Sequence, residues 1–131
     1  MVTRLLIRVD AGYELPIYRQ IVEQVKAAIA SGVLAPGDQL PSHRDLARDL
    51  VVAPLTVSRA YELLEREGFV ATARGKGTFV TTAGSDAASH ASKELRERAN
   101  ALVRHAQALG LRQRDVLDAL QRAWRDGKEK P

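Results

Sequence analysis

The sequence predicts a mainly α-helical protein with one small β-hairpin, and three observations carry this prediction. Apolar residues recur at spacings of three and four in several segments, which is the periodicity of amphipathic helices. Two short runs rich in β-branched and aromatic residues, 69–73 and 78–82, flank the glycine-containing loop 74–77, as in a hairpin. Small residues dominate 83–92, which separate a longer first part of the chain from a shorter second part.

The first part begins with a short apolar run at 5–9, which we expect to form a strand or a packed arm. A first helix is expected to open at Pro16, because proline is tolerated in the first turn of a helix. Its apolar positions recur every three or four residues from Ile17 to Ala28, and Gly32 is expected to end it.

Two shorter helices are expected next, over 44–50 and 54–67. Ser42 followed three residues later by Asp45 resembles a capping box with Asp in place of Glu, and Gly68 is expected to end the third helix. Three helices followed by a hairpin constitute a winged helix-turn-helix, which we assign to residues 1–82.

This arrangement suits DNA, because a helix fits the major groove and the second helix of the turn motif presents its first residues to base edges. In the third helix the outward side chains include hydroxyls, Leu55 and Arg59, and the hairpin tip carries two cations. The alternatives are a helix with a solvated polar face, a solvated turn, and an Arg44 paired with Asp45 or Asp49.

The second part is expected to contain two helices over 93–125, after a linker or frayed helix start at 83–92 and before a disordered tail at 126–131. A heptad-like apolar seam and one apolar helix face are too large for two helices to bury alone, so we expect a homodimer. The alternative is that both helices pack back on the first part of the same chain. The predicted dimerisation residues are Leu95, Ala99, Leu102, Val103, Ala106, Leu109, Val116, Leu117, Leu120 and Trp124.

Composition narrows the function. The chain has 131 residues, of which 45% are hydrophobic, and no cysteine, which excludes disulfides and thiolate metal sites and suits a reducing cytoplasm. No apolar run resembles a secretory signal or approaches the roughly 20 residues of a membrane span. The net charge is +4, but residues 1–82 hold 10 Lys and Arg against 9 Asp and Glu. A DNA-binding role therefore depends on where the cations lie.

Catalysis has little support in the sequence. The three histidines, at positions 43, 90 and 105, have no metal-ligand spacing, and Ser58 has no histidine base near it in sequence. The loop 74–77 lacks the spacing of a nucleotide-binding phosphate loop. We expect no enzyme activity, no cofactor and no metal.

Several short motifs occur in a characteristic order, at 16–18, 37–42, 44–47, 56–61, 64–65, 67–68 and 74–80. Over roughly residues 14 to 81 they resemble the GntR family of bacterial regulators, and the short two-helix tail resembles its YtrA subfamily. The resemblance implies that the arginine of the Pro-Ser-x-Arg segment contacts operator DNA, together with the start of the recognition helix and the wing. The DNA-binding residues it implies are Ser42, His43, Arg44, Pro54, Leu55, Thr56, Ser58, Arg59, Arg74, Gly75 and Lys76.

The chain departs from the family pattern at the turn and at the start of the recognition helix. Val51 replaces a common glycine, and Ala53, Pro54 and Leu55 replace residues that are often polar. Ala53 is also a poor N-cap, at a cost of about 1 kcal/mol relative to Ser or Asn. We therefore expect DNA contact to depend mainly on Arg44, Thr56, Arg59 and the wing.

The expected function is that of a homodimeric repressor that binds a palindromic operator in its own operon. A non-specific architectural DNA binder and a protein-interaction adaptor remain alternatives. Two short helices leave little space for an enclosed effector pocket, although a dimer interface could form one.

Overall fold

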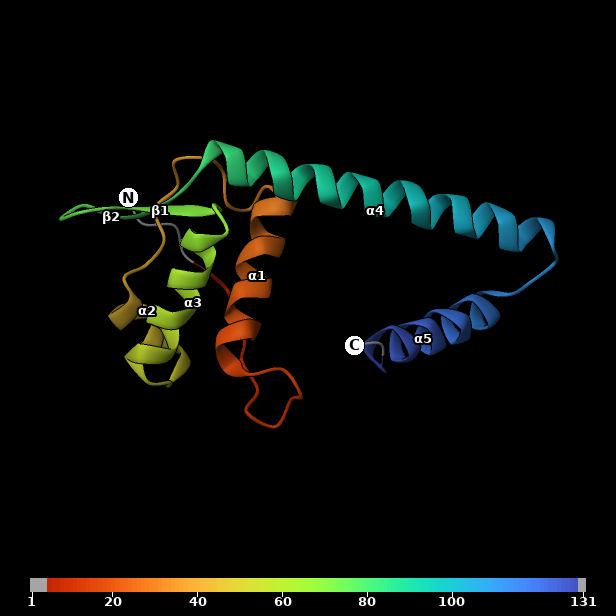
Figure 1. Cartoon of the computed structure of the whole chain (residues 1–131), viewed down its shortest axis with the longest axis horizontal. Coiled ribbons are helices and arrows are strands. Elements are labelled where there is room, and N and C mark those ends of the chain that lie inside the picture. Colours follow the sequence, from red (N-terminus) through yellow and green to blue (C-terminus); the bar gives the residue numbers. More distant parts are fainter. Residues whose placement is uncertain (1–4, 130–131) are drawn as a thin grey trace. The chain divides into compact units, whose positions relative to one another are not determined.

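A computed structural model describes residues 5–129 of the chain (Figure 1). Within them, three helices are followed by a hairpin and two further helices. The chain divides between Ser92 and Lys93 into two compact units, called here the first unit and the second unit. This order of elements confirms the predicted fold class of a helical protein with a small hairpin wing.

In the first unit, α1 (Ile17–Ser31) and α2 (His43–Leu50) both pack against α3 (Pro54–Arg66). The core is aliphatic, as the low aromatic content requires. Its fully buried side chains include Ile21, Val22, Val25, Ile29, Leu34, Leu40, Leu46, Val57 and Leu64. The expected helices are confirmed, with ends that differ by no more than one residue.

The hairpin consists of β1 (Val70–Ala73) and β2 (Gly77–Val80), paired antiparallel. An isolated bridge between Gln39 and Phe79 adds the segment before α2 to the edge of β2. The second strand had been expected to reach residue 82, but it ends at Val80. The Thr81 hydroxyl donates to the carbonyls of Gly68 and Phe69, which lie between α3 and β1.

The apolar run near the N-terminus forms a packed arm and not a strand. Two glutamines on α1 hold residues 5–10 in place with their side-chain amides. Gln20 accepts from the Asp10 N–H and donates to the Asp10 carbonyl, both at 2.8 Å, and Gln24 makes the same pair of bonds with Arg8. These amides substitute for a neighbouring strand and satisfy the backbone of the arm.

α4 (Thr82–Ala108) includes residues 83–92, where a linker or a frayed helix start was expected. Its first turn contacts Thr81, which follows β2, and Phe69, which precedes β1. The Gly84 N–H donates to the Thr81 hydroxyl at 2.9 Å, and a Cβ at Gly84 would lie 2.5 Å from the Phe69 Cα. Only glycine permits this approach of the helix to the Phe69 backbone.

In the second unit, the end of α4 and α5 (Gln113–Glu129) are joined by a turn at Gly110, which has a φ of 73°. α5 continues through residues 126–129, where a disordered tail was expected, and residues 130–131 lie outside the described part. The helix persists because the only helix breaker in 126–129 is Gly127, at a cost of about 1 kcal/mol.

Candidate nucleic-acid interface

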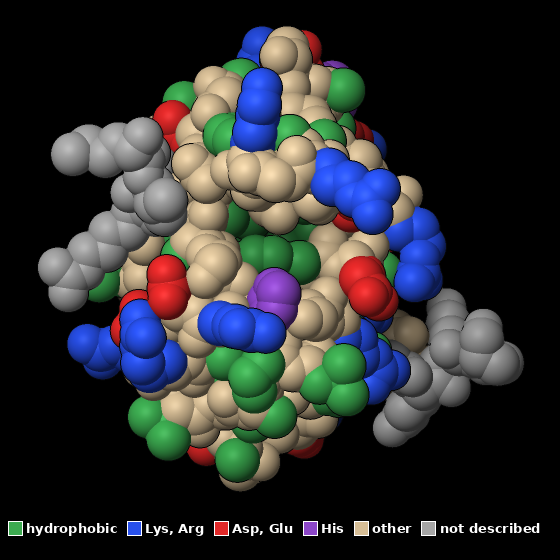
Figure 2. Space-filling model, turned by 90° about the vertical axis from the view of Figure 1, so that its left-hand side faces the viewer, with side chains coloured by type: hydrophobic (Ala, Val, Ile, Leu, Met, Phe, Trp, Pro, Cys, Tyr) green, Lys and Arg blue, Asp and Glu red, His purple; other side chains and the backbone are tan. Residues whose placement is uncertain are grey.

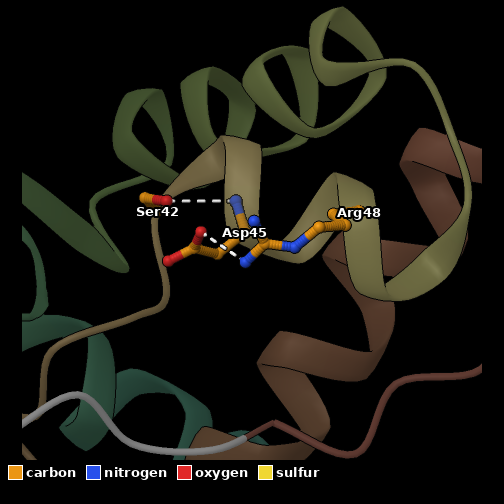
Figure 3. Close-up of polar contacts among 3 residues, drawn as sticks. All are labelled: Ser42, Asp45 and Arg48. Atoms are coloured by element: carbon orange, nitrogen blue, oxygen red, sulfur yellow. Dashed lines mark hydrogen bonds and ion pairs between the residues drawn. The ribbon is translucent and has the colours of Figure 1, made fainter.

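The first turn of α2 is capped as the sequence indicates. The Ser42 hydroxyl accepts from the Asp45 N–H at 3.1 Å (Figure 3). The second half of the expected capping box is not formed, because the Asp45 carboxylate pairs with Arg48 at 2.9 Å. The cap fixes the start of α2, where the exposed His43 and Arg44 lie.

Arg44 is exposed and forms no hydrogen bond or ion pair within residues 5–129. The alternative in which Arg44 pairs with Asp45 or Asp49 is therefore not found. Arg48 is the arginine that engages Asp45. The guanidinium of Arg44 keeps its donors available for an external acceptor, and a guanine edge offers two acceptors in the matching geometry.

α3 begins at Pro54 without a side-chain cap, because the Ala53 side chain has no acceptor. Leu55 in the first turn is 79% exposed, whereas Thr56 and Ser58 are half-buried. The outer surface of the first turn is thus apolar with hydroxyls at its flanks. Such a surface can contact a thymine methyl but can form only a few hydrogen bonds.

Further along α3, Arg59 lies over the ring of Tyr18, with 4.0 Å between the guanidinium carbon and the ring centroid. Tyr18 is half-buried on α1 and packs against the core. The sequence alone assigns no role to Tyr18. Its only signal was the aromatic residue in the first motif, at 16–18.

The wing tip consists of the exposed residues Arg74, Gly75 and Lys76 between the two strands. Gln39 supports it from the segment before α2, because its side-chain amide donates to the Lys76 carbonyl at 2.9 Å. Gly77 has a φ of 126°, and a Cβ there would overlap the Gln39 amide. The position of the tip therefore depends on Gln39, a role that the sequence alone does not reveal.

Tyr61 ties α3 to the segment that leads into α2. Its hydroxyl donates to the Pro41 carbonyl at 2.8 Å. Burial raises the pKa of Tyr61 above its ordinary value, because the phenolate would lose its hydration there. The bond helps to fix the relative placement of the two helices that carry the predicted DNA contacts.

The structure brings the start of α2 and the wing tip to one hollow of about 410 Å³, whose lining includes Ser42, His43, Gly75 and Lys76. Figure 2 shows the side of the molecule toward which the hairpin tip points. Cationic, acidic and apolar side chains are mixed there, around a histidine. This mixture agrees with the balanced charge of residues 1–82.

The predicted dimerisation residues are mostly exposed. Among the ten, Ala106 is buried and Val116 half-buried, whereas Leu95 and Trp124 are 70% and 71% exposed. A cavity of about 460 Å³ lies within the second unit. It is lined mainly by apolar side chains of α4 and α5, including Ala99, Leu102, Val103, Ala106, Val116, Leu117 and Leu120.

Within 5–129, no three His, Cys, Asp or Glu side chains are grouped closely enough to hold a metal ion. None of the helices in this range is long and apolar enough to cross a membrane.

The chain is similar to known regulators of transcription. The profile of the family described as "Bacterial regulatory proteins, gntR family" matches residues 17–80. The HTH-type transcriptional repressor YtrA of Bacillus subtilis is 46% identical over 76 residues, which is 58% of each chain. The HTH-type transcriptional regulator Rv1152 of Mycobacterium tuberculosis is 39% identical over 112 residues, 85% of this chain and 88% of that protein.

Several similar solved structures contain DNA. The DNA-binding domain of AraR in complex with operator ORX1 matches with a TM-score of 0.53 and 26% identity, over 59% of this chain and 96% of that domain.

Proposed function

Because the chain belongs to the GntR family of bacterial regulators and is a DNA-binding transcription regulator and not an enzyme, we propose that it acts in the cytoplasm as a homodimeric repressor of its own operon. Its site is a palindromic operator. The observation that carries this proposal is Arg44, an exposed and unpaired arginine beside the capped start of α2. The repressor activity of YtrA and the operator complex of AraR support it.

We assign base reading mainly to α2 and the start of α3. Arg44 donates to a guanine in the major groove, and Thr56 and Ser58 donate from half-buried hydroxyls. Leu55 offers an apolar contact for a thymine methyl. Ser42, His43 and Pro54 lie beside these residues, where they contact the sugar-phosphate backbone.

The wing reaches the adjacent minor groove. Arg74 and Lys76 lie on either side of Gly75, whose φ of 78° bends the tip and whose missing side chain allows close approach of the backbone. Cations in a minor groove gain from the phosphates on both sides of it. The bond from Gln39 to the Lys76 carbonyl keeps the tip in place before DNA arrives.

The second unit joins two copies through its apolar seam and the apolar face of α5. Large side chains such as Leu95, Leu102, Leu120 and Trp124 are exposed in one chain, and burying them stabilises an association. A two-fold dimer presents two identical reading units, which a palindromic operator matches. Any effector would bind where the two copies meet, since the cavity of the second unit is lined by the same seam.

The test of DNA reading is a footprint over the region upstream of the protein's own gene. Arg44→Ala is compared with Arg48→Ala, which removes the same charge from the same helix but from an arginine already engaged with Asp45. We expect Arg44→Ala to weaken the protected site by about 5- to 150-fold for each bound copy, as for the loss of a bidentate base contact worth about 1–3 kcal/mol. Arg48→Ala should stay within about threefold of wild type.

Three outcomes would contradict the proposal. Full specific affinity in Arg44→Ala would remove its assigned role. Binding that depends on salt but not on sequence would favour an architectural DNA binder. The absence of any effect at the promoter in Arg44→Ala and Arg59→Ala would favour an interaction adaptor.

The dimer is tested by light scattering after size exclusion. Leu102→Glu places a charge on the apolar seam, and Asn100→Glu places the same charge about 160° away around the same helix. We expect Leu102→Glu to yield monomers and Asn100→Glu to leave the dimer intact. A wild-type protein that is monomeric at micromolar concentration and still binds a full operator tightly would contradict the dimer.

A further inference from the structure

The contact between Arg59 and Tyr18 joins a recognition-helix cation to the aromatic face of another helix. The guanidinium carbon lies 4.0 Å from the ring centroid, well within the range of a cation–π interaction. Tyr18 is half-buried and packed against the core, so its ring is a fixed support. Arg59 itself is exposed.

This support leaves the hydrogen-bonding capacity of Arg59 unused. A ring face attracts the cation through its quadrupole and accepts no conventional hydrogen bond. Within residues 5–129, no oxygen accepts a bond from Arg59, whereas Arg48 and Arg98 each spend a donor on a carboxylate. Arg59 is thus held in place and yet retains its N–H groups for an external anion.

The position of Arg59 selects the kind of anion. Bases are read by the first residues of a recognition helix, but Arg59 lies five residues after the start of α3 at Pro54. Its guanidinium is also drawn toward α1 by the Tyr18 ring. We propose that Tyr18 is a positioning residue for DNA binding, which holds Arg59 ready to bind a backbone phosphate beside the major groove. This inference rests on the DNA-binding function proposed above.

A preorganised arginine binds more tightly than a mobile one, because its rotamers are already restricted before DNA arrives. A phosphate contact carries no sequence information and responds to salt. Loss of Arg59 or of its support should therefore weaken all duplexes equally. Loss of Arg44, in contrast, should reduce the preference for one sequence.

The test uses the full chain and two probes, a duplex selected by the wild-type protein from a random pool and an unrelated duplex of equal length. The variants are Tyr18→Leu, Tyr18→Met and Tyr18→Phe, Arg59→Ala, and the double variant with Tyr18→Leu and Arg59→Ala. Arg66→Ala is the matched control, since Arg66 is an exposed arginine near the end of the same helix without a ring beneath it. Affinities are measured over a range of salt, well below each variant's melting temperature.

We expect Tyr18→Leu and Tyr18→Met to weaken both duplexes by the same factor, about three- to tenfold for each DNA-bound copy, as for one side chain per copy that must now be ordered on binding. Arg59→Ala should lower the slope of log Kd against log salt by about 0.9 for each DNA-bound copy, as for one lost phosphate contact. In the Arg59→Ala background, Tyr18→Leu should have no further effect. Tyr18→Phe keeps the ring and should keep most of the affinity.

The proposal is overturned if Tyr18→Leu weakens binding equally with and without Arg59, because Tyr18 would then act by itself. It is also overturned if Arg59→Ala weakens only the selected duplex at an unchanged salt slope, as a base contact would. A lower melting temperature with unchanged affinity in both Tyr18→Leu and Tyr18→Met would show that the contact between Arg59 and Tyr18 stabilises the fold and does not assist DNA binding. If no duplex can be selected at all, the proposed function itself fails.

Discussion

Val51 occupies a backbone conformation that its side chain disfavours, and relieving it should stabilise the first unit. Val51 follows the last residue of α2 with φ 56° and ψ 51°, and it is the only residue other than glycine with a positive φ among those described. A β-branched side chain in this left-handed region is a genuine outlier. The perturbation is Val51→Gly.

Two opposing contributions set the expected gain in the free energy of unfolding. The left-handed conformation costs about 1–2 kcal/mol for a residue with a Cβ. Replacing valine by glycine lowers the free energy of unfolding by about 0.5–1 kcal/mol, because glycine increases the entropy of the unfolded chain. Val51 is 87% exposed, so its removal loses almost no packing. The net gain is about 0.5–1 kcal/mol, or about 2–8 °C in Tm for a unit of this size.

The assay is thermal and urea unfolding of the full chain, followed by circular dichroism. Val33→Gly is the matched control, because Val33 is 64% exposed and has no positive φ. We expect Val33→Gly to lower Tm while Val51→Gly raises it. Equal losses of Tm in both variants would refute the assignment of strain to Val51.

Three further predictions concern the surrounding contacts. Ser42→Ala should destabilise by about 1 kcal/mol and Ala53→Ser should stabilise by a similar amount, because one removes and the other adds an N-cap acceptor; urea unfolding measures both, and a neutral Ser42→Ala would contradict the cap. Gln39→Ala should weaken operator binding by about two- to tenfold, since the wing tip loses its anchor of about 0.5–1.5 kcal/mol, with faster amide exchange at 74–76 as the independent measurement. Stability should fall as pH rises above about 10, the ordinary pKa of tyrosine, because burial raises the pKa of Tyr61 in the fold; Tyr61→Phe should remove that part of the fall, and an identical pH profile would contradict it.

The helices, the hairpin and the cap at Ser42 could be predicted because each depends on local sequence. Apolar spacing, the Ser42–Asp45 pair and the glycine-containing loop act over a few residues, and neighbouring elements do not override them. The extent of α5 was underestimated, because a polar stretch with one glycine gives no periodic signal even when it is helical.

The contacts that support the interface could not be predicted, because they join residues far apart in the chain. Arg59 meets Tyr18 across 41 positions and Gln39 meets Lys76 across 37. The apolar run at 5–9 fits either a strand or a packed arm, and the partners of the arm are side-chain amides on α1, which the pattern of the run does not reveal. Apolar periodicity assigns a residue to one face of a helix or strand, but it does not show which other element packs against that face.

The nearly balanced charge of the first unit turns the salt dependence of binding into a test of the whole arrangement. With no diffuse positive field, the salt dependence should report only localised contacts. Each copy presents Arg59, Arg74 and Lys76 to phosphates, while Arg44 contacts a base. Two copies on a palindrome thus make about six phosphate contacts, and the slope of log K against log salt should be about −5. A single bound copy should give about −3, so a slope this shallow on a full operator would contradict either the dimer or the assignment of the three cations. A slope near −5 that drops to about −3.6 in Arg59→Ala would support both, because each of the two bound copies loses one contact and four remain.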